Sequence, residues 1–500
     1  MISFTFRLAL AVAALVIVLP AAVRAQEITA ASPSPATSTC WVTATEQEFN
    51  ILQPWEKKQP RRKRGIGALI HGNRLLVSAD LIANSTFIEL ERPTDGAKTT
   101  AKVVGRDYEA NLAVVQPVES PDNFLEGMVP LAIDERLAVG HSLTTWQLEK
   151  EGTPVLTTGI VNRAEVNTYA LSHRRFLRFN VRISLENKTG GFSLPLVRDG
   201  KLAGILLSFT ADEQVARIIP GPVISHFLTD LDDGDYQGFP SLGVGYAETT
   251  DETFRKYLGL NGTKGGIYIT KVATNTPADK AGLKEGDVLV SIDGKAIDRR
   301  GNYDSDRYGK LSFSHLISSR YVGDSVELDI LRDGKHMTVN ATVTRKAPHN
   351  YVIDPFIYDR GPNYLMLGGL LLQELSRDYI TSFRDWRDNA PIELQAAMAN
   401  TDELEQGTAT GRKFVFLSYT IPTPATVGYE EMRGLPVESI NGKPILRMED
   451  VAAALNSPVD GVHHIVFSGN RPDAYIDADL ADRVNDHLKQ SGMALQRIVR

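Results

Sequence analysis

Apolar and polar positions alternate in short runs along the first half of the chain. Between residues 65 and 208 each apolar run ends at a turn signal, as where Ala68-Leu69-Ile70 is followed by His71-Gly72-Asn73. Short apolar runs bounded by glycine, asparagine and aspartate are typical of β-strands joined by turns. The spacing therefore predicts an all-β barrel or sandwich for this part of the chain.

Two later regions share a second pattern, in which an apolar run leads into an Asp-Gly or Asn-Gly turn and a lysine. Val290-Ser291-Ile292-Asp293-Gly294-Lys295 lies in the region 239–344, and Val437-Glu438-Ser439-Ile440-Asn441-Gly442-Lys443 lies between Tyr364 and the C-terminus. Such self-similarity predicts a duplicated module. The acidic stretch 230–235 is the expected boundary before the first copy, and the polar, helix-prone stretch 385–411 is an insertion in the second.

The second copy is expected to end in a helix. Leu480, Val484 and Leu488 share one helical face, because residues four apart lie above one another on a helix. Asp477 precedes them and is the candidate N-cap.

Length and composition set the broad class. The 500 residues suggest about three domains, since a domain averages roughly 150 residues. Hydrophobic residues make up 42% and charged residues 23%, which predicts folded, globular domains. The net charge of −7 gives no general attraction to nucleic acid or to an anionic membrane. The basic stretch Lys57–Arg64 departs from this balance; it is either a solvated lead-in to the first strand or a docking patch for an acidic partner.

The N-terminus has the pattern of a signal peptide. Arg7 precedes an apolar run from Leu8 to Leu19, and the small-residue sequence Val23-Arg24-Ala25 predicts cleavage after Ala25. The run is shorter than the ~20 apolar residues of a membrane span, although an uncleaved anchor is the alternative. No later stretch is long and apolar enough to span a membrane, so we expect a periplasmic or extracellular protein.

Residues 26–59 are predicted to form a flexible leader, because the stretch 31–45 is rich in serine, threonine and proline. Cys40, the only cysteine, lies in this leader. A single cysteine excludes an intramolecular disulfide and a cysteine-rich metal site, and leaves an intermolecular disulfide open. No cluster of histidine, cysteine and carboxylate residues has metal-ligand spacing, so neither a metal nor another cofactor is expected.

Taken in order, these segments resemble the HtrA/Deg family of trypsin-like serine proteases. The resemblance is most specific between Gly265 and Gly294, and the region with Leu367-Gly368-Gly369-Leu370 is similar to the plant-type branch. It implies a mainly β fold, with a trypsin-like double β-barrel at 60–232 followed by two PDZ-like α/β modules. The modules are expected at 238–346 and 360–500, the second with a helical insertion and a C-terminal helix.

The same resemblance locates a catalytic triad whose residues are all changed. Asp80 stands at the histidine position, Asn111 at the aspartate position and Thr189 at the serine position, while Asn187 replaces a glycine of the oxyanion loop. A hydroxyl without an adjacent base is a weak nucleophile. The substitutions therefore predict a pseudoprotease with no working catalytic residues.

A relocated triad is the alternative to inactivity. The domain contains His71, His141 and His173, and Ser193 lies just beyond Thr189. None of these residues lies in a motif that would direct it toward Thr189. An active serine endopeptidase of protein quality control with an altered site therefore stays an alternative, and a purely structural assembly scaffold is another.

The first module offers a candidate peptide-binding site. A PDZ domain adds an extended peptide to a strand edge and receives the terminal carboxylate in a loop of N–H groups. Here the expected loop is Ser241-Leu242-Gly243-Val244, which leads into the strand containing Tyr246. The opposite wall is predicted to be a helix at 311–319 that includes His315.

The second module is a weaker candidate. Its counterpart of the loop is Leu367-Gly368-Gly369-Leu370, and its insertion favours a structural or assembly role over peptide binding. The expected partners are peptide C-termini or unfolded chains. A homo-oligomer, a trimer or a multiple of one, and an active Deg protease are partners implied by the resemblance alone.

Overall fold

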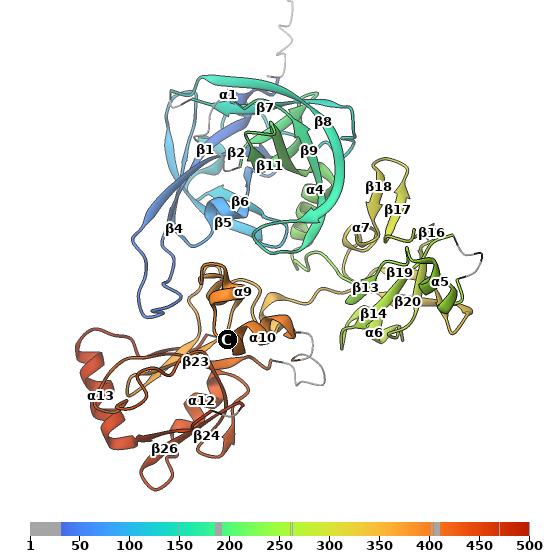
Figure 1. Cartoon of the computed structure of the whole chain (residues 1–500). Coiled ribbons are helices and arrows are strands. Elements are labelled where there is room, and N and C mark those ends of the chain that lie inside the picture. Colours follow the sequence, from blue (N-terminus) through green and yellow to red (C-terminus); the bar gives the residue numbers. More distant parts are fainter. Residues whose placement is uncertain are drawn as a thin grey trace, which may run out of the picture. The chain divides into compact units, whose positions relative to one another are not determined.

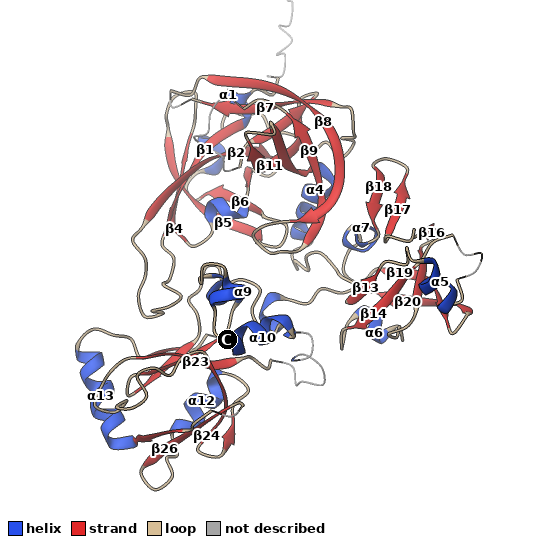
Figure 2. Ribbon diagram, in the orientation of Figure 1, coloured by secondary structure: helices blue, strands red, loops and turns tan. Residues whose placement is uncertain are grey.

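The computed structural model describes residues 32–149, 151–185, 193–260, 262, 264–401, 404, 411–469 and 471–499. The expected signal peptide lies outside these described residues. Strands dominate the fold, and the two longest described helices, Gly221–Asp232 and Ala478–Gln490, have 12 and 13 residues (Figures 1 and 2). No helix in the described part of the chain combines the length and apolar character needed to cross a bilayer.

The first domain begins with a closed β-barrel. Its strand order is β1-β2-β3-β6-β5-β4. The strands are β1 (Thr39–Glu46), β2 (Arg61–Ile70), β3 (Arg74–Val77), β4 (Ser85–Glu91), β5 (Lys98–Asp107) and β6 (Leu112–Pro117). The short helices are α1 (Pro35–Ser38), α2 (Ala79–Ile82) and α3 (Pro121–Phe124).

The first barrel contradicts two predictions, that residues 26–59 form a flexible leader and that the first domain starts at residue 60. Residues 35–46 form α1 and β1, and β1 pairs with both β2 and β4 to close the barrel. Cys40 lies in β1 with no exposed surface, and burial raises the pKa of its thiol to about 12. An intermolecular disulfide through Cys40 is therefore incompatible with the folded barrel.

A second closed barrel follows, in the order β10-β11-β12-β9-β8-β7. Its strands are β7 (Ser142–Leu148), β8 (Pro154–Thr168), β9 (Arg175–Arg182), β10 (Pro195–Arg198), β11 (Lys201–Thr210) and β12 (Val215–Pro220). Helix α4 (Gly221–Asp232) ends the domain. Two closed barrels in succession confirm the predicted double β-barrel, and closure leaves no free strand edge in either.

The first C-terminal module is an open sheet in the order β13-β14-β15-β19-β20. Its elements are β13 (Val244–Ala247), α5 (Glu252–Tyr257), β14 (Ile267–Val272), α6 (Pro277–Lys280), β15 (Val288–Ile292), β16 (Lys295–Ala296), β17 (Asn302–Ser305), β18 (Gly309–Ser312), α7 (Ser314–Ser318), β19 (Ser325–Arg332) and β20 (Lys335–Thr342). Strand β16 pairs with β15, and β17 with β18 form a separate hairpin. Strand β13 lies at one edge of the sheet.

The second module has a larger sheet, in the order β28-β21-β22-β23-β24-β26-β27 with β25 on β24. Its strands are β21 (Tyr364–Leu367), β22 (Leu370–Glu374), β23 (Val415–Thr420), β24 (Leu435–Ile440), β25 (Lys443–Pro444), β26 (Val462–Phe467), β27 (Ala474–Asp477) and β28 (Gln496–Arg497). The helices are η1 (Pro348–Asn350), which precedes the module, and α8 (Arg377–Thr381), α9 (Trp386–Asn389), α10 (Ile392–Ala399), α12 (Met448–Leu455) and α13 (Ala478–Gln490).

Several predicted features of this module are present. Helices α9 and α10 lie in the predicted insertion, and α13 is the predicted C-terminal helix. The Asp477 carboxylate accepts a hydrogen bond from the Leu480 amide at 2.7 Å, so it caps α13. Asn441 and Asp293 follow equivalent strands and both have positive φ, 52° and 48°, as tight turns require.

Candidate functional site

The histidine and aspartate positions of the triad lie side by side in the first barrel. Asp80 is in the first turn of α2, and Asn111 precedes β6 with a φ of 55°. The Asn111 side-chain oxygen accepts a hydrogen bond from the Asp80 amide at 2.9 Å, and its carbonyl accepts one from the Ala79 amide at 3.2 Å. Asn111 thus fastens the start of α2 to the barrel.

The Asp80 side chain is set in a largely buried place. Burial raises the pKa of its carboxyl above the usual range. Lys63 reaches the backbone carbonyl of Asp80 at 3.1 Å and the carboxylate of Glu46 at 2.7 Å. Lys63, bonded to both residues, helps to hold α2 in place. The side-chain amide of Asn111 cannot stabilise an imidazolium cation as a carboxylate would.

Thr189 and Asn187 lie outside the described residues. Ser193, just beyond them, is buried with a φ of 57°, and its hydroxyl oxygen accepts a hydrogen bond from the Ser78 amide at 2.9 Å. Ser78 precedes α2 in the first barrel, whereas Ser193 precedes β10 in the second. The Ser193 hydroxyl therefore joins the two barrels.

The three histidines of this domain occupy other places. His71 is exposed in a turn, His141 accepts a hydrogen bond from the Ala138 amide at 3.2 Å, and His173 has a φ of 60° in the loop before β9. Within the part of the chain that the structure describes, none of them is hydrogen-bonded to Asp80 or Ser193.

The predicted loop of the first module turns its carbonyl groups inward. The Leu242 carbonyl accepts from the Ala278 amide at 3.0 Å, and the Gly243 carbonyl accepts from the Ala273 amide at 2.9 Å. The amides of Leu242 and Gly243, in contrast, donate to no acceptor among the described residues. Two consecutive unpaired N–H groups are a backbone arrangement that can receive an anion.

Glycine is required in this loop at one position. Gly243 has a φ of 83°, and a Cβ atom there would lie 2.3 Å from the Cβ of Thr276. Both the left-handed backbone and the close approach exclude larger residues. Thr276 is itself fixed as the N-cap of α6.

Strand β13 follows the loop and offers a free edge. It pairs with β14 on one side, and no described strand pairs with its other side. All four of its residues are half-buried. The Tyr246 ring packs edge-to-face against Phe313, with ring centres 5.1 Å apart. A free strand edge beside free amides is the arrangement that accepts an extended peptide.

His315 belongs to a different cluster. The predicted helix at 311–319 is shorter, since α7 covers Ser314–Ser318. The Nδ1 atom of His315 lies 2.6 Å from the Tyr303 hydroxyl, and burial lowers the pKa of the imidazole to about 4. The ring also lines a cavity of about 210 Å³ together with His226 and Tyr321. The structure therefore places this neutral histidine against the β17–β18 hairpin.

Two PDZ domain family models match the chain, at residues 240–343 and 353–487. The chain is 29% identical over 434 residues to protease Do-like 2, chloroplastic, of Arabidopsis thaliana, covering 85% of this chain and 68% of that protein. It is 27% identical over 339 residues to protease Do-like 4, mitochondrial, of the same plant. That match covers 67% of this chain and 63% of that protein. Together with the double β-barrel, these likenesses support an HtrA/Deg trypsin-like protease with two PDZ domains.

The chain spans about two thirds of the length of these curated relatives. Among solved structures, one titled HtrA-type protease AlgW with decapeptide covers 63% of this chain and 97% of that chain, at 19% identity and a TM-score of 0.46.

In the described residues of the second module, the counterpart of the Ser241–Val244 loop is closed. Leu367-Gly368-Gly369-Leu370 forms the turn of a β-hairpin, with Leu367 paired to Leu370. The Gly368 amide donates to the side-chain oxygen of Asn485 in α13 at 2.9 Å. The sequence motif resembled a carboxylate loop, but its two glycines serve a tight turn.

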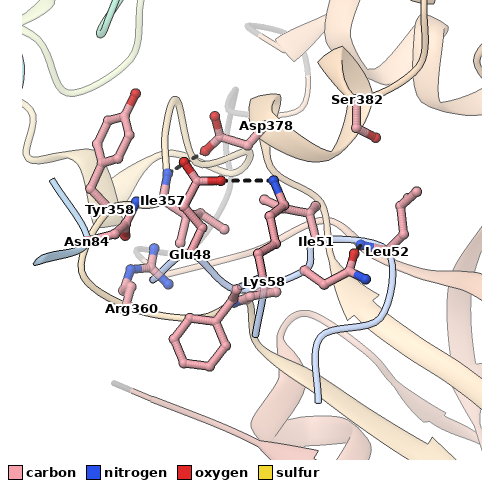
Figure 3. A pocket seen from close by; sticks show the side chains of 13 residues that line it. Glu48, Ile51, Leu52, Lys58, Asn84, Ile357, Tyr358, Arg360, Asp378 and Ser382 are labelled. Carbon is pink, nitrogen blue, oxygen red and sulfur yellow. Dashed lines mark hydrogen bonds and ion pairs between the residues drawn. The ribbon is translucent and has the colours of Figure 1, made fainter. Parts of the chain in front are cut away.

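A cavity of about 300 Å³ lies between the β1–β2 loop, the segment 357–362 and α8 (Figure 3). In it the Asp378 carboxylate accepts from the Ile357 amide at 2.5 Å, and Glu48 pairs with Lys58 at 2.8 Å. Burial raises the pKa of Asp378 to about 6. None of the predicted site residues lines this cavity, and the described residues contain no group able to hold a metal ion.

Sequence reasoning missed an anchoring residue near this cavity. Asp359 and Asn84 exchange hydrogen bonds between side chain and amide, each 2.8 Å long. The Asp359 carboxylate also pairs with Arg106 at 2.9 Å and accepts from the Tyr108 hydroxyl. An aspartate before Arg-Gly-Pro looks like an ordinary turn residue, so no local signal indicated these contacts.

Proposed function

We propose that this HtrA/Deg chain is an exported pseudoprotease that binds peptide C-termini or unfolded chains through its first PDZ module. Its role is that of a scaffold, a chaperone-like protein or a regulator of an active relative. The observation that carries the proposal is the pair of free amides at Leu242 and Gly243 beside the free edge of β13.

Backbone recognition explains why such a site suits unfolded chains. An added strand is held by main-chain hydrogen bonds that every peptide can make, and the terminal carboxylate accepts from the loop amides. Charge-assisted hydrogen bonds of this kind are stronger than neutral ones. Specificity is then left to side chains near Val244 and Tyr246, which are half-buried and apolar.

Loss of catalysis is inferred from proton chemistry. An activated hydroxyl needs a neighbouring base, and a histidine base needs a carboxylate to hold its tautomer. Asp80 places a carboxylate where the imidazole base is needed, and Asn111 places an amide where the orienting carboxylate is needed. The Asn111 side-chain oxygen is engaged by the Asp80 amide. Thr189 would then carry an ordinary, weakly nucleophilic alcohol. Export through residues 1–25 and assembly into a trimer or a multiple of one complete the proposal.

Peptide binding is tested by fluorescence anisotropy with the full chain. The probe is a pool of fluorescein-labelled decapeptides that end in leucine or valine with a free carboxylate. The matched control is the same pool with amidated C-termini, which removes the charged acceptor and nothing else. We expect binding of the free acids and weak binding of the amides. Equal binding of both pools, or of neither, would contradict the proposal, and the second result would favour a structural scaffold.

Catalysis is tested with a fluorophosphonate probe, which labels only an activated hydroxyl, alongside casein as substrate. We expect neither labelling nor casein cleavage. Labelling or cleavage that is present in the native chain and absent in Thr189→Ala would show an active endopeptidase with an altered site.

A further inference from the structure

The second module contains a strand at the place where the first module has its free edge. The two sheets share one order, β13-β14-β15-β19-β20 in the first and β22-β23-β24-β26-β27 in the second. Strand β22 is therefore the counterpart of β13. Beyond β22 the sheet continues with β21 and then β28, whereas no described strand pairs with the outer edge of β13.

Strand β21 pairs with β22 along its whole length, in the antiparallel direction. The register runs from Tyr364 opposite Gln373 to Leu367 opposite Leu370. An added peptide strand makes the same kind of main-chain pairing with a PDZ edge. On its other side β21 pairs with β28, where the Met366 amide donates to the Leu495 carbonyl at 2.8 Å.

The side chains of β21 are buried on both faces. No residue of β21 is more than 7% exposed, in contrast with the half-buried residues of β13. Leu365 and Leu367 join the core of the module with Met448 and Val451 of α12. This helix follows β25 as α7 follows the β16–β18 region, so it is the groove helix of the second module. Alternate side chains that enter a groove are the specificity elements of a bound strand.

At the end of β21 a side-chain oxygen takes the place that the C-terminal carboxylate of a bound peptide would have. The Gly368 amide, which begins the turn, donates to the side-chain oxygen of Asn485 at 2.9 Å. A Cβ atom on Gly368 would lie 3.1 Å from the Cβ of Ala481, so α13 packs directly on the turn. The Gly368 amide is therefore engaged within the module, whereas the Leu242 amide of the first module is not.

We propose that the second PDZ module is occupied by a ligand that the chain itself supplies. Strand β21 stands where an external peptide would lie, with Leu367 and Leu365 in the groove and Asn485 in place of the carboxylate. Because a two-residue turn tethers this strand, its effective concentration exceeds that of any free peptide. The inference goes beyond the proposed function, since it assigns external peptides to the first module alone.

Hydrogen exchange with mass spectrometry on the full chain tests this assignment. Without peptide, the amides of 370–374 should exchange at least about tenfold more slowly than those of 244–247, because they are paired on both sides. A saturating decapeptide ending in Tyr-Leu-Met-Leu with a free carboxylate should slow exchange at 241–247 and leave 370–374 unchanged. New protection at 370–374 in the native chain would overturn the proposal.

A variant pair tests whether β21 is the occupant. Leu365→Ala with Leu367→Ala removes the side chains that enter the groove, and we expect faster exchange at 364–367 and a second peptide-binding event at 370–374. The control is Ile476→Ala, an equally buried core residue on β27 at the far end of the sheet. Release of β21 without any new binding would also overturn the proposal.

The outcomes separate this inference from the proposed function. If the double variant does not fold, the native chain still tests the proposal, through exchange at 370–374 with and without peptide. If the first module binds no peptide, protection of 370–374 in the free chain still reports whether β22 is covered.

Discussion

The two PDZ modules of this chain share a strand order and differ at one edge. In the first module β13 is half-buried and open, next to free amides at Leu242 and Gly243. In the second, β22 is covered by β21, and the corresponding amide of Gly368 is bonded to Asn485. The comparison shows that one fold can leave this strand edge unpaired or cover it with a further strand of its own chain.

The difference has a physical reason. An open strand edge exposes unpaired main-chain groups and is a liability unless a ligand uses it. A covered edge buries apolar side chains and pairs those groups, which stabilises the module. We therefore expect substitutions at β13 to change binding and substitutions at β22 to change stability.

The largest expected effect is on the stability of the second module. Leu372→Ala in β22 removes a side chain with no exposed surface and should cost about 2–5 kcal/mol of unfolding free energy. Val244→Ala in the half-buried β13 should cost about 1 kcal/mol or less. Denaturant unfolding followed by module-resolved hydrogen exchange measures both. Equal losses of unfolding free energy in the two variants would contradict the expected difference between the modules.

The next effect is on peptide affinity. Gly243→Ala places a Cβ atom 2.3 Å from Thr276 and should weaken peptide binding by about a hundredfold, or ~2.7 kcal/mol. Gly282→Ala is the control, because its φ of 79° carries the same backbone cost and no atom lies within 4 Å of the new Cβ. Anisotropy titrations should show near-native affinity for this control.

Lowering the pH should destabilise the first module and stabilise the second. The folded pKa of His315 is lowered to about 4, so the unfolded state takes up the proton first as pH falls below 6.5, and the first module loses stability. The folded pKa of Asp378 is raised to about 6, so protonation below pH 6 relieves the cost of burying its charge, and the second module gains stability.

Between pH 8 and pH 5 the expected changes are a loss of about 2 kcal/mol and a gain of about 1 kcal/mol. Hydrogen exchange at the two pH values measures them separately. His315→Gln should remove the first change and Asp378→Asn the second. A shift of both modules in the same direction, insensitive to these variants, would contradict the assignment.

The smallest effect concerns the turn of the second module. Asn485→Ala leaves the Gly368 amide without its acceptor and should cost about 1 kcal/mol. Asn485→Asp keeps an acceptor oxygen at the same place and should retain the stability. Thermal unfolding of the two variants gives the comparison, and equal destabilisation by both would argue against a carboxylate-like role for this side chain.

Much of the architecture could be predicted from the sequence. Short apolar runs between turns indicated the barrels, and the repeated Asp-Gly-Lys and Asn-Gly-Lys segments indicated the duplicated modules. The strand β1 was missed because its Ser/Thr/Pro-rich flank hid the apolar residues Cys40, Trp41 and Val42, which are buried in the barrel. Composition over a window is a weak guide where a single strand closes a sheet.

The site was predicted less completely. The loop at Gly243 could be proposed from the sequence because it requires glycine at a particular position. The cover over β22 depends on pairing with β21 and on Asn485, more than a hundred residues away. The Leu-Gly-Gly-Leu motif is compatible with both an open loop and a tight turn, so only tertiary contacts decide. The place of His315 is likewise set by Tyr303 on a neighbouring hairpin.

The most direct test is the stoichiometry of peptide binding to the full chain, measured by calorimetric titration with a decapeptide that ends in leucine and a free carboxylate. We expect one peptide per chain, with that binding lost in Gly243→Ala. Two peptides per chain, or one that persists in Gly243→Ala, would contradict it.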